Sequence, residues 1–104
     1  MKPYKRSDRV KIEIQRILAE AFINDVRDPR LQYANVVRVE VSSDLKIAKV
    51  YVSVRDRSKI SEVIEILNKA KGYFRTLLSK RMEIRQVPEL KFEEFKENEW
   101  FFEY

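Results

Sequence analysis

The first quarter of the chain carries apolar residues at the spacing of an amphipathic helix. These positions are Val10, Ile14, Ile17, Leu18, Ala21, Phe22 and Val26. Ser7 is the expected N-cap, because its hydroxyl can accept a hydrogen bond from a free backbone N–H. We expect the helix to end near Val26, since Asp28 precedes Pro29 and a residue before proline disfavours the helical conformation.

Alternation of apolar and polar residues follows and predicts two β-strands. The residues expected to face the core are Val37, Val39 and Val41 in the first strand and Ala48, Val50, Val52 and Val54 in the second. The turn over residues 42–44 is too short for a crossover connection, so the two strands should form an antiparallel hairpin. The apolar face of this hairpin has to be covered by helices.

A second helical pattern extends from about residue 58 to 82 and starts at Ser58 or Ser61. Its apolar positions are Ile60, Val63, Ile64, Leu67 and Ala70, followed by Phe74, Leu77, Leu78 and Met82. One straight helix of this length would span about 38 Å, whereas a domain of this size is about 33 Å wide. We therefore predict a break at Gly72, the single glycine of the chain, which permits a kink or caps the first helix.

A third strand is predicted around Leu90, Phe92 and Phe95, after Val87-Pro88. The predicted order is α-β-β-α-α-β in one domain over residues 1–104, with a three-stranded sheet and helices packed on one face. This is an α+β fold. The direction of the third strand within the sheet does not follow from the pattern.

Composition excludes several classes of chemistry. The chain has 104 residues, no Cys, no His and one Gly. Disulfides, Cys/His zinc sites, a His general base and glycine-rich nucleotide loops are therefore excluded. Composition leaves open a metal site built of carboxylates alone and a Lys/Tyr acid–base pair. Because the carboxylates are scattered along the sequence, we expect no enzyme activity, no cofactor and no metal site. No apolar run approaches 18 residues, so we expect a cytoplasmic protein with no membrane partner.

The net charge of +5 is distributed unevenly. Residues 1–16 carry six basic side chains against two acidic ones, and residues 69–85 carry six against Glu83 alone. Residues 86–104 reverse this, with six Glu and two Lys. Two basic segments that meet on one face would suit a polyanion, most commonly nucleic acid. Solvated helix surfaces in a charge-rich protein are the alternative.

Four segments, in order and at matching spacing, resemble a known family. They are Asp28-Pro29-Arg30-Leu31; residues 39–53, with Val39-Glu40-Val41-Ser42, Asp44-Leu45 and Ala48-Lys49-Val50-Tyr51-Val52-Ser53; residues 67–72 with Arg75; and Arg85-x-Val87-Pro88-Glu89-Leu90-x-Phe92. On these segments the chain resembles the ribosome-binding factor A family over nearly its whole length. Ser43 departs from the proline that the family often has in the hairpin turn, and residues 93–104 match no pattern of the family.

The resemblance implies a type II KH-like fold, in which Ala70-Lys71-Gly72 stands where other KH domains have GxxG. It also implies binding to the small (30S) ribosomal subunit through 16S rRNA and a non-enzymatic role in its late maturation and rRNA processing, linked to cold adaptation. A monomer is expected, and another assembly factor such as a GTPase is a possible partner. Two alternatives stay open: a general RNA-binding KH module, and a protein-interaction adaptor that uses the sheet edge and the C-terminal end.

The predicted RNA contacts centre on Lys69, Lys71 and Arg75, because basic side chains near a helix start bind phosphate by charge and geometry. A solvated helix face is the alternative interpretation for these three. Lys46 and Lys49, on the polar side of the hairpin, are expected either to contact RNA or to protect the sheet edge.

The basic arm over residues 1–6 and the first turn of the helix add Lys5, Arg6 and Arg9. These residues either grip RNA or belong to an ordinary disordered terminus. Arg81 and Arg85 either contact rRNA or neutralise a helix C-terminus, and we favour the second role.

Five residues are expected to be structural: Asp28, Pro29, Arg30, Asp44 and Pro88. The first two stop the helix, Arg30 pairs with a carboxylate, Asp44 closes its turn through a backbone N–H, and Pro88 sets the start of the last strand. The C-terminal end over residues 96–104 is acidic and aromatic, with Trp100, Phe101, Phe102 and Tyr104. It is expected to pack on the domain, with a partner contact as the alternative.

Overall fold

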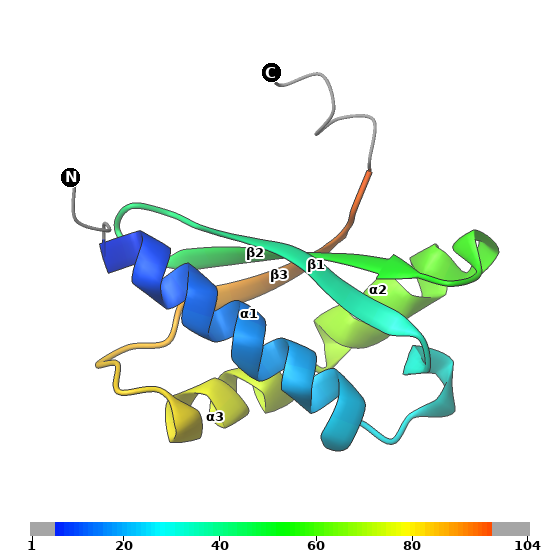
Figure 1. The fold of residues 1–104 in the computed structure, drawn as a ribbon, viewed down its shortest axis with the longest axis horizontal. Helices are drawn as coiled ribbons and strands as arrows, with labels where there is room; N and C mark the ends of the chain where they lie inside the picture. The colour runs from blue at the N-terminus through cyan, green and yellow to red at the C-terminus, as the bar shows by residue number, and fades with distance from the viewer. Residues whose placement is uncertain (1–5, 97–104) are drawn as a thin grey trace.

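The computed structural model describes residues 6–96 of the chain. Its elements are α1 (Arg6–Asn24), the 3-10 turn η1 (Pro29–Leu31), β1 (Ala34–Val41), β2 (Ile47–Val54), the 3-10 turn η2 (Arg57–Lys59), α2 (Ile60–Lys69), α3 (Lys71–Arg81) and β3 (Glu89–Glu94). The sheet order is β1-β2-β3, with β1 antiparallel and β3 parallel to β2. The three helices lie on one side of the sheet (Figure 1). The α+β, KH-like fold that the sequence predicts is therefore confirmed.

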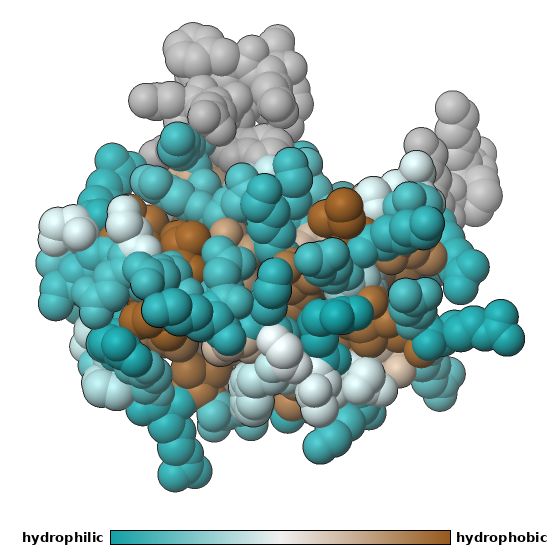
Figure 2. Space-filling view, turned by 180° about the vertical axis from the view of Figure 1, so that it is seen from behind, coloured by the Kyte–Doolittle hydropathy of each residue, from teal (hydrophilic) through white to brown (hydrophobic). Residues whose placement is uncertain are grey.

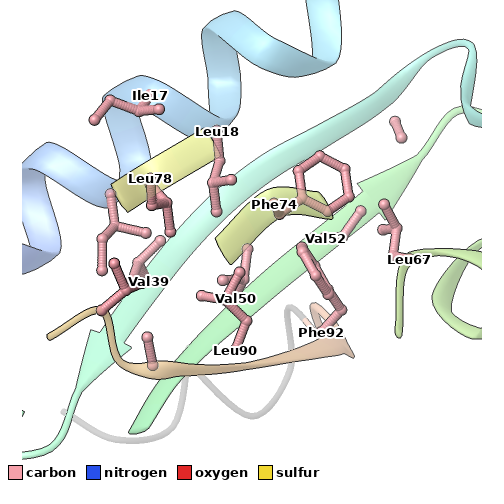
Figure 3. Packing of buried hydrophobic residues seen from close by; sticks show 14 of the residues in the cluster. Ile17, Leu18, Val39, Val50, Val52, Leu67, Phe74, Leu78, Leu90 and Phe92 are labelled. Carbon is pink, nitrogen blue, oxygen red and sulfur yellow. The ribbon is translucent and has the colours of Figure 1, made fainter. Parts of the chain in front are cut away.

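One hydrophobic core fills the space between the sheet and the helices. Phe74 of α3 lies at its centre, with its ring 5.7 Å from Phe22 of α1 and 5.4 Å from Phe92 of β3. Figure 3 shows Phe74 pointing toward Val52 and Phe92, while Leu78 of the same helix packs near α1. Because these side chains are nearly or completely buried, α3 is fixed against both α1 and the sheet.

A β-bulge changes the predicted facing of β1. Val36 pairs with Val52 and Arg38 pairs with Tyr51, so Val37 is an extra residue on this strand. The side chain of Val37 is consequently 36% exposed, and its expected place in the core was wrong. The four core-facing positions of β2 were predicted correctly.

The ends of α1 differ from the expected ones. The helix already includes Arg6 and Ser7, and it ends at Asn24 rather than near Val26. Asp28 lies four residues after the last residue of α1. Its carboxylate instead caps η1, where it accepts a hydrogen bond from the backbone N–H of Arg30 at 2.9 Å.

The second helical region also starts and breaks elsewhere than expected. Asp56 caps η2 by accepting from the Ser58 N–H at 3.1 Å, so neither Ser58 nor Ser61 is an N-cap of α2. The break falls at Ala70, which ends α2 and precedes α3 with φ −96° and ψ 9°. Gly72 lies inside α3 with a negative φ, so the expected break at this glycine was two residues too late.

The third strand is close to its prediction. Leu90 and Phe92 of β3 are buried in the core, and so is Pro88, which directly precedes the strand. Phe95 follows the strand rather than belonging to it, and its N–H donates to the Val52 carbonyl at 2.9 Å. The strand runs parallel to β2 because the α2–α3 connection returns the chain to the end of the sheet where β2 begins.

Candidate functional site

The helix changes direction between α2 and α3 (Figure 1). Lys69, the last residue of α2, and Lys71, the first residue of α3, flank this break. The Ala70 N–H still bonds back to α2, to the carbonyls of Ile66 and Leu67, and the Ala70 carbonyl accepts from Tyr73 in α3. Ala70 therefore serves both helices. The first turn of α3 begins at Lys71, and backbone N–H groups at a helix start favour anions.

Both lysines make exposed ion pairs. The Lys69 ammonium lies 3.0 Å from the Glu65 carboxylate, and the Lys71 ammonium lies 3.8 Å from that of Glu89. The side chains of Lys69 and Glu65 are 75% and 66% exposed, so water screens this pair strongly. Such pairs contribute little to stability, and a phosphate group can replace the glutamate at small cost.

Arg75 has a structural contact in addition to its predicted role. Its guanidinium donates to the Val87 carbonyl at 3.2 Å and so connects α3 to the segment that leads into β3. Of its remaining N–H groups, those that face solvent are available to a ligand, because a guanidinium carries five donors. The predicted phosphate contact of Arg75 stays a prediction.

A groove of about 380 Å³ adjoins the break. It is lined by Ile47, Asn68, Lys71, Glu89, Leu90 and Lys91. The Glu89 N–H donates to the Lys46 carbonyl at 2.8 Å, which holds the hairpin turn beside the start of β3. The structure therefore places the backbone of Lys46 next to Glu89, whose carboxylate is the ion-pair partner of Lys71, although Lys46 itself does not line the groove.

Asn68 fixes the wall of this groove. Its amide N–H donates to the Phe92 carbonyl at 3.0 Å, and its amide oxygen accepts from the Phe92 N–H at 2.9 Å. The side chain thereby occupies the outer edge of β3 as a neighbouring strand would. The sequence analysis did not identify Asn68, Ile47 or Lys91 as site residues. Lys91 alone could have been found, because it alternates with Leu90 and Phe92 and so had to lie on the polar face of the predicted strand.

The other predicted basic residues lie elsewhere. Lys49 is exposed on the side of the sheet opposite the helices. Arg6 and Arg9 are exposed in the first turn of α1, and within residues 6–96 no hydrogen bond or ion pair joins them to the break. Lys5 and residues 97–104, including the four aromatic residues of the C-terminal end, lie outside the described part of the chain.

Two further arginines differ in their surroundings. The Arg81 guanidinium lies 3.0 Å from the Asp25 carboxylate and so connects the end of α3 to the residue after α1. Arg85 is exposed in the loop before β3. Arg81 thus has a carboxylate partner within the protein, whereas the role of Arg85 stays a prediction.

Two of the residues expected to be structural are carboxylates that close turns. The hydrogen bond from the Arg30 guanidinium and that from the Arg30 N–H lower the pKa of Asp28. The Ser42 hydroxyl, donating at 2.6 Å, and the Lys46 N–H lower the pKa of Asp44 in the hairpin turn. Both groups are therefore held ionised by local hydrogen bonds, which is the environment of a turn-forming side chain.

Neither a metal cluster nor a membrane-spanning helix is present over residues 6–96. Within these residues, no three Cys, His, Asp or Glu side chains gather as metal ligands would. No helix in the same range is long and apolar enough to cross a bilayer. The face shown in Figure 2 is mostly hydrophilic, with separate small apolar spots.

Sequence comparison places these features among known relatives. A protein-family model described as ribosome-binding factor A matches residues 6–99. Ribosome-binding factor A of Thermodesulfovibrio yellowstonii is 40% identical over 92 residues, which cover 88% of this chain and 78% of that protein. The protein of the same name from Cellvibrio japonicus is 47% identical over 92 residues, covering 86% and 68%.

Solved structures share the fold. The solution NMR structure of a Thermotoga maritima protein is 40% identical in sequence and covers 93% of each chain with a TM-score of 0.78. A homology model of Thermus thermophilus ribosome-binding factor A, fitted into a cryo-EM map of a complex of the 30S subunit with that factor, gives a TM-score of 0.69. It is 27% identical and covers 81% of this chain and 89% of the other.

Proposed function

The chain belongs to the ribosome-binding factor A family, and from that premise we propose that it binds the small ribosomal subunit through 16S rRNA. We further propose that it assists the late maturation and rRNA processing of that subunit by binding alone, without catalysing a reaction. The absence of His and Cys from the sequence supports a role of this kind, since the commonest general base and the thiol nucleophile are both missing.

The observation that carries the proposal is the helix break with its adjoining groove. Lys69 and Lys71 flank Ala70 at the start of α3, Lys71 and Lys91 line the groove, and the Lys46 backbone adjoins it through Glu89. Phosphate is the ligand that suits ammonium groups beside a helix N-terminus. The exposed glutamates now paired with Lys69 and Lys71 would be exchanged for phosphate oxygens on binding.

Such a surface reads the backbone and shape of folded RNA more than its base sequence. A protein that only binds can still direct maturation, because it stabilises whichever rRNA arrangement it binds best. The proposed mechanism is therefore preferential binding to an immature subunit and release from the mature one, whose rRNA arrangement it binds less tightly.

The first test is co-sedimentation with purified small subunits, large subunits and whole ribosomes at low and moderate salt. The wild-type chain should be retained on small subunits, with affinity that falls steeply as salt rises. The double substitution Lys69→Gln and Lys71→Gln should weaken binding about tenfold and lower the salt slope by about two. Glutamine is chosen because it removes each charge without placing two acidic groups together.

The matched control is the double substitution Arg27→Gln and Lys80→Gln, which removes the same charge from exposed residues that do not line the groove. Its binding should stay within about twofold of wild type. Equal loss in both doubles would mean that net charge, rather than the break, drives binding. Retention on every RNA-containing particle would favour a general RNA-binding module instead.

The maturation part of the proposal needs a separate comparison. Small subunits that still carry unprocessed 16S rRNA ends should retain the chain more tightly than mature subunits in the same assay. A chain that binds mature and immature subunits equally could not shift the equilibrium between them. Equal affinity would therefore contradict the maturation role and leave the binding role standing.

A further inference from the structure

A second cavity lies at the opposite end of α2 from the helix break. Its volume is about 350 Å³. Its walls come from η1, the end of β2, η2 and the first turn of α2, and they include Arg30, Tyr33, Arg55, Lys59 and Glu62. The ten residues of α2 make it about 15 Å long, and this length separates the cavity from the break. We call this cavity the Tyr33 pocket.

Tyr33 is unusual in both backbone and exposure. Its φ is +68°, in the left-handed region that a tyrosine rarely adopts. Its side chain is 56% exposed, so burial of the ring does not account for this conformation. Asn35 supports the conformation by donating from its amide to the Tyr33 carbonyl at 3.2 Å. A strained residue that presents an aromatic ring to solvent is typical of a ligand contact.

A cation lies over the ring. The Arg55 guanidinium carbon is 5.2 Å from the centroid of the Tyr33 ring, which is within cation–π distance. Arg55 and Tyr33 therefore already form a cation–π pair in the wall of the pocket. Unpaired nucleobases stack on such surfaces, on tyrosine rings and guanidinium planes alike.

The charges of the pocket favour an anionic ligand. Its cations are Arg30, Arg55 and Lys59, and within residues 6–96 no ion pair is formed by Arg55 or Lys59. Its acidic residues are Asp56, which accepts from the Ser58 hydroxyl at 2.7 Å and attracts Lys59, and Glu62, which attracts Arg30. Three cations against two carboxylates leave the lining with a net charge of +1, and Arg55 and Lys59 are its cations outside ion pairs.

We propose that the Tyr33 pocket binds one unpaired nucleotide of RNA, with its base stacked on the Tyr33 ring and its phosphate contacted by Arg55 and Lys59. The inference rests on the proposed function only for the identity of this RNA, the rRNA of the small subunit. The pocket would add a contact to unpaired RNA at a site remote from the backbone contacts at the break. An acidic peptide would satisfy the two cations but would leave the exposed ring unused.

The test separates the ring from the fold. Tyr33→Asn removes the ring and places at this position a residue that tolerates positive φ, so the variant should fold at least as well as wild type. Its affinity for small subunits should fall about tenfold or more, in line with the loss of one stacked base. Tyr33→Phe keeps the ring and should bind within about twofold of wild type. The Lys69→Gln/Lys71→Gln variant serves as the reference for the proposed function. If that variant binds small subunits weakly while Tyr33→Asn binds them normally, the nucleotide-binding role of the Tyr33 pocket is overturned and the proposed function stands.

Two further measurements identify the ligand class. A benzophenone amino acid at position 33 should cross-link to rRNA in the small-subunit complex, whereas a cross-link to a ribosomal protein alone would overturn the proposal. In NMR titration of the chain with a single-stranded RNA hexamer, the signals of Tyr33 and Arg55 should shift, and an RNA duplex should shift them less. If the wild-type chain fails to bind small subunits at all, the proposed function falls. The hexamer titration then decides the pocket alone: shifts support it and their absence overturns it.

Discussion

The paired hydrogen bonds of Asn68 should be among the most important polar contacts of the domain. They connect the last turn of α2 to the backbone of Phe92, 24 residues away, and both are part-buried. The substitution Asn68→Ala removes them and leaves the N–H and C=O of a buried strand residue without a partner. Because Asn68 directly precedes Lys69, the same change releases the turn that positions the helix break.

The expected loss can be worked out from these contacts. An unsatisfied buried backbone group costs about 1–3 kcal/mol, and partial access to water puts each of these two groups near the lower end, at about 1–1.5 kcal/mol. Together they cost about 2–3 kcal/mol, and the better helix propensity of alanine restores about 0.5 kcal/mol. The free energy of unfolding should therefore fall by about 2 kcal/mol.

Urea unfolding followed by circular dichroism measures this difference directly. The midpoint should fall by about 1.5 M, and the thermal midpoint by about 10 °C. Asn24→Ala is the matched control, because Asn24 is exposed at the end of α1 and has no side-chain hydrogen bond within residues 6–96. Its unfolding free energy should stay within about 0.5 kcal/mol of wild type.

Asn68→Asp isolates the donor side of the contact. A carboxylate still accepts from the Phe92 N–H but cannot donate to the Phe92 carbonyl, which it faces with like partial charge. Folding then favours the protonated acid and raises its pKa. The variant should therefore be more stable at low pH, and the stability should be lost as pH rises through the folded-state pKa. The reasoning is wrong if the unfolding free energies of Asn68→Ala and Asn68→Asp at pH 7 both lie within about 0.5 kcal/mol of the wild-type value. Water would then take over the hydrogen bonds of the amide.

Three further outcomes can be measured with the same unfolding assay. Gly72→Ala should stabilise the free protein by about 0.5 kcal/mol, since the residue is helical and an added Cβ has no neighbour within 4 Å; a loss of stability would contradict this. A double-mutant cycle between Arg81 and Asp25 should give a coupling energy below about 1 kcal/mol, because the pair is partly exposed; a larger value would show that solvent screens it less than its exposure indicates. The pKa of Asp44 is lowered in the fold, so its contribution is fully present above its ordinary value of 3.8 and is lost as pH falls through the folded-state pKa. Wild type should consequently lose more stability than Asp44→Asn between pH 5 and pH 2, and parallel curves would contradict the role given to this carboxylate.

Periodicity was enough to predict the elements but not every local register. The stripe of α1 and the alternation of β2 identify core residues because each pattern has a single buried face. The bulge at Val37 was not predicted, because Val37, Val39 and Val41 alternate with polar residues as in a regular strand. The sequence pattern is therefore the same with and without the extra residue. The parallel direction of β3 was likewise not predicted, because the same alternation suits either direction.

The position of a candidate site could be predicted only where charge marked it. Lys69 and Lys71 stand out as a basic run beside a helix break, and the structure indeed places them there. Asn68 carried no signal, because its partner is distant in sequence and a neutral amide is common on helix surfaces. The Tyr33 pocket was missed for the same reason: Tyr33 and Arg55 are 22 residues apart, and only the fold brings the ring and the cation together.

Gly72 shows how a correct residue can be chosen for the wrong reason. We expected the glycine to be required by the break, but the break is at Ala70 and needs no positive φ. No neighbour within the described chain crowds the position either, since an ideal Cβ there would lie in open space. No contact within residues 6–96 therefore requires glycine in the first turn of α3, where alanine would be more stable. The proposed phosphate contact supplies a reason, because a helix start without side chains lets an RNA backbone come closest to its N–H groups. Gly72→Ala should then combine higher stability with weaker binding to small subunits, and a variant that gains stability while binding normally would show that the RNA backbone does not approach this turn.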